Sequence, residues 1–85
     1  MNEHELATRT YELPEMFADR VPADELDSLH SMAEGGEWGE LLDLLVAGLL
    51  FTGAAVTRVE RDRLQEVLEG WGLPTGQLDE LVVRR

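Results

Sequence analysis

The chain has 85 residues, no cysteine, no lysine and 18 acidic residues against seven arginines, which gives a formal net charge of −11 at pH 7. This length fits one domain with one modest core and leaves little room for an enclosed active site. The absence of cysteine excludes disulfides and thiolate chemistry and is compatible with the cytoplasmic location that we expect. The charge disfavours binding to nucleic acid or to anionic membranes and favours a basic protein surface.

The acidic residues are unevenly distributed along the chain. Residues 1–51 carry a net charge of −10, whereas residues 52–85 carry a net charge of −1. Acidity can serve solubility alone, but this asymmetry favours an acidic face that binds a partner. No stretch has the pattern of a signal peptide, and the most apolar stretch, residues 41–56, is too short and too interrupted to span a membrane.

Apolar residues recur at the 3.6-residue spacing of helices almost throughout the chain, and β-branched residues are scarce. We therefore predict an all-α fold: one domain over residues 1–85, built as a single small bundle of four to five short antiparallel helices, with no strand. The first helical segment spans residues 1–20, with Leu6, Leu13 and Phe17 on one face. Pro14 removes a backbone donor inside it and should kink or split this N-terminal helix.

Two further helices are predicted before residue 52. The second begins at Pro22, which suits a first helical turn, and ends at the glycine pair 35–36; its core face holds Leu26, Leu29 and Ala33. The third covers residues 37–51, and its core stripe consists of Trp38, Leu42, Leu45, Val46 and Leu49. Leu44 and Phe51 lie on the opposite side of this helix, either buried centrally in the bundle or presented to a partner.

The strongest local signal is a capping box, in which Thr57 and Glu60 each satisfy a free amide at a helix start. The helix that it opens carries Leu64, Val67, Leu68 and Trp71 towards the core and ends at Gly70, Gly72 and Pro74. Thr75 is expected to cap a last short helix with Leu78, Leu81 and Val82 inward. Arg84 and Arg85 would then suit the negative end of that helix dipole.

No arrangement of residues favours catalysis, a metal site or a cofactor. His4 and His30 lie in different predicted helices without a neighbouring ligand pattern. Ser28 after Asp27 weakly resembles the attachment serine of acyl carrier proteins, but it lies inside a helix instead of at its start. No EF-hand sequence or nucleophile–base pattern is present. We therefore expect a protein that is not an enzyme.

Three motifs in order resemble the MafI family of bacterial toxin-immunity proteins, which has relatives in contact-dependent growth inhibition systems. They are GEWGELLDLL at residues 36–45, AAVT at residues 54–57 and WGL at residues 71–73. The similarity as a whole extends over residues 22–82. Leu41 stands where that family usually has alanine, Ala55 stands where it often has proline, and the segment around Pro14 has no counterpart.

The resemblance implies an immunity protein, or antitoxin, that neutralises a cognate bacterial toxin, often a nuclease, by stoichiometric blockade. The alternative is an acidic helical adaptor or a small structural subunit. We predict the face that meets a basic partner from the acidic residues that lie outside the core stripes. Two apolar residues of the third helix belong to the same face. The predicted partner-binding residues are Asp24, Asp27, Glu34, Glu37, Glu40, Leu44 and Phe51.

Overall fold

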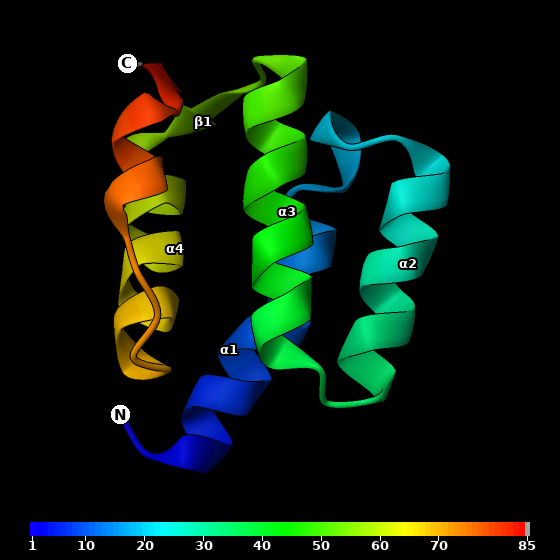
Figure 1. Cartoon of the computed structure of the whole chain (residues 1–85), viewed down its shortest axis with the longest axis vertical. Helices are drawn as coiled ribbons and strands as arrows, with labels where there is room; N and C mark the ends of the chain where they lie inside the picture. Colours follow the sequence, from blue (N-terminus) through cyan, green and yellow to red (C-terminus); the bar gives the residue numbers. More distant parts are fainter. Residues whose placement is uncertain (85) are drawn as a thin grey trace.

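A computed structural model of the chain describes residues 1–84 (Figure 1). Four α-helices make up most of this part of the chain, so the prediction of a small, mostly helical bundle is confirmed. None of the helices in residues 1–84 is both long and apolar enough to cross a membrane. In chain order the elements are α1 (Glu3–Met16), the 3-10 turn η1 (Ala18–Arg20), α2 (Ala23–Glu34), α3 (Trp38–Thr52), β1 (Ala55–Thr57), α4 (Arg58–Gly70), the 3-10 turn η2 (Gly76–Glu80) and β2 (Val82–Arg84).

Helix α1 runs past Pro14 without being split by it. The side chain of Asn2 caps the helix by accepting a hydrogen bond from the Glu5 amide at 2.8 Å. Pro14 lies in the last turn, where the loss of one amide donor leaves the preceding turns intact. The α-helical segment ends at Met16, and the chain continues as η1 after Phe17.

Helices α2 and α3 form an antiparallel hairpin on one side of the molecule (Figure 1). Gly36 adopts a positive φ of 68° in the turn between them, and the Glu37 amide donates back to the Met32 carbonyl at 2.9 Å. Gly53 ends α3 in the same left-handed conformation, with a φ of 67°. Because other residues adopt this conformation at a cost, these glycines fix where both helices end.

The core draws side chains from every helix. Leu41 is fully buried beside the predicted stripe of α3. Trp38 and Trp71 are only partly buried, and they stack on each other at a centroid distance of 6.2 Å. The Trp71 indole N–H also donates to the Thr10 hydroxyl at 3.0 Å. The buried apolar residues are Leu6, Leu13, Phe17, Leu29, Ala33, Leu41, Leu42, Leu45, Val46, Leu49, Val56, Leu64, Val67, Leu68, Leu78 and Leu81.

The C-terminal segment differs from its prediction. Residues 76–80 form a 3-10 turn, and the Thr75 side chain caps nothing. Val82 is 54% exposed and belongs to β2, which pairs parallel with β1 in a two-stranded sheet. Helix α4 supplies the crossover that parallel strands need. Arg84 therefore lies in a strand and not at a helix end, and Arg85 lies outside the described residues.

One carboxylate joins the start of α4 to the end of α1. Glu60 accepts from the Thr57 amide at 2.8 Å, while its own amide donates to the Thr57 hydroxyl at 3.1 Å, so the predicted capping box is confirmed. The same carboxylate accepts two hydrogen bonds from the Arg20 guanidinium, at 2.5 and 2.6 Å. Arg20 also donates to the carbonyls of Met16 and Ala55.

These contacts shift the titration of Glu60 and Arg20 in opposite directions. The hydrogen bonds from Arg20 lower the pKa of Glu60 from 4.5 to about 2, and the bond from the Thr57 amide acts in the same direction. The pKa of Arg20 is raised, chiefly by its hydrogen bonds to Glu60. The ionised pair therefore stabilises the folded chain at neutral pH.

Replacing this carboxylate should remove a pH-dependent part of the stability. Because the folded pKa of Glu60 is about 2 against an ordinary 4.5, its contribution is complete above pH 4.5 and is lost as the pH falls towards 2. Glu60→Gln should lower the free energy of unfolding at pH 7 by about 1.5–3 kcal/mol, as expected for hydrogen bonds to a charged group. Urea unfolding at pH 7, 4.5, 3 and 2 measures the difference from wild type, which should shrink below pH 4.5.

Glu80→Gln is the matched control, because Glu80 is exposed and makes no side-chain hydrogen bond or ion pair with residues 1–84. Its difference from wild type should stay near zero at every pH. A Glu60→Gln deficit that is the same at pH 7 and at pH 2 would contradict the role given to the ionised pair.

Candidate partner-binding face

The α2–α3 hairpin carries negative charge that no lysine or arginine of the same segment balances. Residues 21–57 contain seven carboxylates and neither lysine nor arginine. None of these seven forms an ion pair with any residue in 1–84. A surface of this kind attracts cations and basic proteins over roughly a Debye length, about 8–10 Å in ordinary salt. The seven carboxylates are those of Asp24, Glu25, Asp27, Glu34, Glu37, Glu40 and Asp43.

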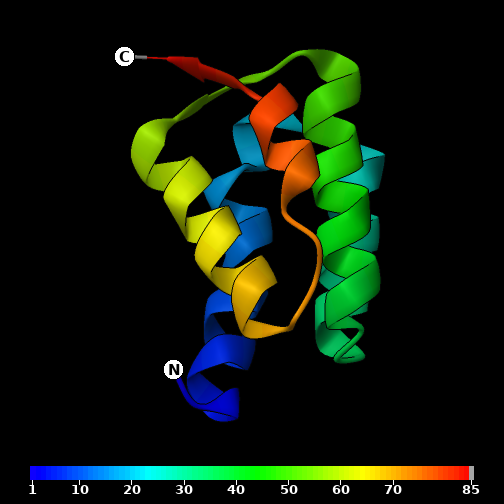
Figure 2. The ribbon, with the colours of Figure 1, turned by 60° about the vertical axis from the view of Figure 1, so that its left-hand side comes forward.

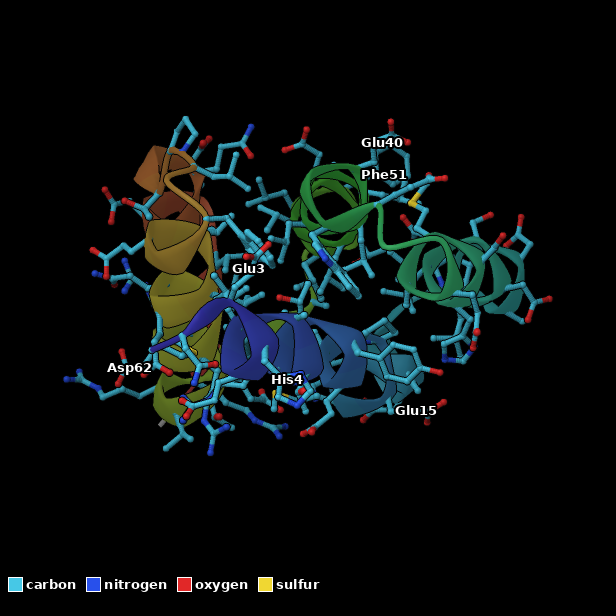
Figure 3. The ribbon with its side chains drawn as sticks, turned by 90° about the horizontal axis from the view of Figure 1, so that it is seen from below. Glu3, His4, Glu15, Glu40, Phe51 and Asp62 are labelled. Atoms are coloured by element: carbon cyan, nitrogen blue, oxygen red, sulfur yellow. The ribbon has the colours of Figure 1, made fainter. Side chains whose placement is uncertain are left out.

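The outward face of α3 changes from acidic to apolar along its length. At spacings of three and four residues it presents, in order, Glu37, Glu40, Leu44, Ala47 and Phe51. Glu40 and Phe51 project from the same side of α3 in the view from below (Figure 3). They are eleven residues apart, which places them about 16 Å apart along the helix axis. Phe51 therefore shares the predicted face with Glu40 but does not lie beside it.

The two apolar candidates on this face have different environments. Leu44 is partly buried and packs against the core. Phe51 is 93% exposed, the largest exposed fraction among the large apolar side chains of residues 1–84. An aromatic ring held in water at the end of an apolar stripe adds nothing to the core, so it is the residue on this face most available to a partner.

A shallow groove of about 370 Å³ begins at the Phe51 ring, between the end of α3 and the start of α2. Gly48 forms part of its floor, and a Cβ atom there would lie 2.5 Å from a Glu25 carboxylate oxygen. The missing side chain thus allows Glu25 to lie across α3. The groove combines apolar walls with one carboxylate and is lined by Pro22, Glu25, Ala47, Gly48, Phe51 and Thr52.

The predicted acidic residues of α2 do not all share this face. Glu34 accepts a hydrogen bond from the Tyr11 hydroxyl of α1 at 2.8 Å, and this contact raises the pKa of Tyr11. His30, four residues earlier, lies 3.0 Å from Glu15 of α1. Asp27 precedes both at helical spacing, so Asp27 and Glu34 lie on the flank of α2 nearest α1.

Asp24 is exposed in the first turn of α2, the end of that helix where the groove lies. The structure therefore groups Glu37, Glu40, Leu44 and Phe51 along α3, with Asp24 close to the Phe51 end. Sequence reasoning missed Glu25 at the groove. Its only signal was Gly48, a glycine inside an apolar helix, which often marks a close approach of a neighbouring element.

His4 and Ser28, which were also singled out in the sequence, lie on different helices. Within residues 1–84, no three His, Asp or Glu side chains are placed to hold a metal ion. His4 is exposed near the start of α1. The Ser28 hydroxyl donates to the Asp24 carbonyl one turn earlier, inside α2.

Comparison with family models, with curated proteins and with solved structures found no match. The resemblance to MafI-type immunity proteins therefore stays a prediction from the three sequence motifs.

Truncating the two apolar residues of α3 should separate a packing role from an exposed one. Leu44→Ala should lower the free energy of unfolding by about 1–2 kcal/mol, less than for a fully buried leucine, because Leu44 is only partly buried. Phe51→Ala should change it by less than about 0.5 kcal/mol, since the ring is exposed. Thermal and urea unfolding measure both; a Phe51→Ala loss as large as that of Leu44→Ala would show that the ring packs within the fold.

Proposed function

We propose that this chain is an immunity protein that binds a cognate bacterial toxin domain with a basic surface and blocks it stoichiometrically. One observation carries the proposal: the α2–α3 hairpin, whose carboxylates form no ion pair with residues 1–84, also carries a groove lined by Glu25 and the exposed Phe51 ring. This is the composition of an interface with an apolar centre and a charged rim. The sequence motifs that resemble MafI-type proteins point to the same class of partner.

A toxin that cleaves nucleic acid is the partner that best matches this charge. Such an enzyme needs a basic cleft for its polyanionic substrate. A chain of net charge −11 is attracted to the same cleft, and attraction of this kind raises the association rate. Occupying the cleft then excludes the substrate, so the blockade requires no catalytic group on the immunity protein.

The groove at Phe51 fits an arginine or lysine side chain of the toxin. The aliphatic stem of such a residue would lie over Ala47 and Gly48, and its charged head would reach the Glu25 carboxylate. The face of the Phe51 ring offers the same cation a second favourable contact. A cation is therefore a better occupant of this groove than an uncharged apolar side chain.

Co-expression with the protein encoded directly upstream tests the function. An immunity gene should follow its toxin gene, so we expect a stable one-to-one complex in a pull-down and rescue of growth from the toxin. A chain that serves as an acidic adaptor or structural subunit would instead follow no toxin gene and would protect no cell from one.

Charge reversal on α3 should act on the association rate. Glu37→Lys together with Glu40→Lys should slow association at low salt by about tenfold and flatten its dependence on salt, because rim charges steer the encounter. Surface plasmon resonance at several salt concentrations measures this. The control is Glu12→Lys together with Asp62→Lys, which changes the net charge equally on α1 and α4. Equal slowing in both variants would mean that net charge, and not this face, guides the partner.

Phe51 should act on the dissociation rate. Phe51→Ala should raise it by about thirtyfold, the effect of a hot-spot loss of about 2 kcal/mol, with little change in association. Val59→Ala is the control, because it truncates another exposed apolar side chain on a different helix. A Phe51→Ala complex that dissociates at the wild-type rate would remove the ring from the interface.

A further inference from the structure

The end of the molecule that carries the C-terminus has an open sheet edge (Figure 2). The two strands pair in the register Ala55–Val82, Val56–Val83 and Thr57–Arg84. Beyond β1, the Arg20 guanidinium donates to the Ala55 carbonyl at 3.3 Å and occupies part of that side. All three residues of β2 are exposed. Its outer edge is therefore the edge to which another strand has access.

Exposed apolar side chains lie on β2 and on the first turn of α4. Val59 of α4 is 67% exposed, and Val82 and Val83 of β2 are 54% and 40% exposed. Val59 and Val83 line a hollow of about 330 Å³ together with Thr57, Arg58 and Arg84. The hollow adjoins the end of the strand pair where Thr57 and Arg84 are partners, so side chains at one end of a strand added to β2 would reach it.

The charge here is opposite to that of the α2–α3 hairpin. Within residues 1–84, neither Arg58 nor Arg84 forms an ion pair, whereas Arg61 is paired with Asp79. A second, neighbouring hollow is lined by Arg58, Arg61, Asp62 and Val83. Asp62 is the one carboxylate that lines either hollow. The edge thus offers two arginines to a negatively charged partner on an otherwise acidic protein.

We propose that the outer edge of β2 binds an extended acidic segment of a partner protein as an added strand. Main-chain hydrogen bonds would give affinity, as they do wherever a peptide extends a sheet. Alternate residues would place carboxylates near Arg58 and Arg84 and apolar side chains on Val59 and Val83. A second copy of this edge carries the same two arginines, so repulsion between like charges disfavours it as the occupant.

A designed peptide tests this surface without the toxin, so the result is independent of the proposed immunity function. The probe is a fluorescently labelled octapeptide of alternating glutamate and valine, and its control has lysine in place of each glutamate. Fluorescence anisotropy at low salt should show that the full chain binds the glutamate peptide and not the lysine peptide. No binding of the glutamate peptide, or equal binding of both, overturns the proposal.

Two arginine variants locate the site. Arg58→Glu should weaken binding of the glutamate peptide by at least about tenfold, because attraction becomes repulsion. Arg63→Glu gives the same net charge on the same helix, outside both hollows, and should bind as the wild type does. Circular dichroism verifies that each variant is folded. Equal weakening by both variants overturns the proposal, because it assigns the effect to net charge.

Amide NMR separates an added strand from a loose contact between charges. With the glutamate peptide bound, exchange of the amide hydrogens should slow in residues 82–84, and shifts should extend to residues 57–59. Shifts spread over the α2–α3 hairpin, or an unchanged exchange rate along β2, would contradict strand addition.

Discussion

The Glu60 carboxylate holds together two parts of the chain that share no local sequence. It caps α4 through the Thr57 amide and accepts two hydrogen bonds from Arg20, forty residues earlier. Arg20 in turn binds the carbonyls of Met16 and Ala55 and lies over the Phe17 ring at 4.9 Å. The end of α1, the turn that leads into α2 and the start of α4 are therefore fixed to one another.

The ion pairs of residues 1–84 leave the carboxylates of the α2–α3 hairpin without a partner charge. Apart from Arg20, three basic residues form ion pairs within residues 1–84, namely Arg9, His30 and Arg61, and the α2–α3 hairpin has no basic side chain other than His30. Mutual repulsion of its carboxylates opposes folding, and the buried leucines of α3 offset it. A cationic partner would relieve that repulsion, which is the physical basis of the proposed toxin binding.

Local signals predicted much of the fold. The capping box was readable because Thr57 and Glu60 are three residues apart, and the ends of α2 and α3 were readable from glycines. The strands were not, because three-residue elements carry too little periodicity to distinguish from loops. Thr75 had the residue type of a cap, but the segment after it formed a 3-10 turn in which its side chain caps nothing.

The candidate face was only partly predictable for a similar reason. Helical spacing predicted that Glu40, Leu44 and Phe51 lie on one side of α3. In the structure Glu40 and Phe51 are exposed on that side and Leu44 is partly buried. Spacing within one helix says nothing about its neighbours, so the contact of Glu34 with Tyr11 and the position of Glu25 against Gly48 came only from tertiary packing. Sequence reasoning therefore joined acidic residues of α2 that the fold divides between two flanks.

The most direct test of the central claim is a hydrogen-exchange footprint of this chain bound to the protein encoded directly upstream. The account predicts slower amide exchange in the complex at the start of α2 and along α3, strongest around Phe51. Protection confined to residues 57–84 would contradict the claim that the acidic hairpin is the surface that meets the toxin.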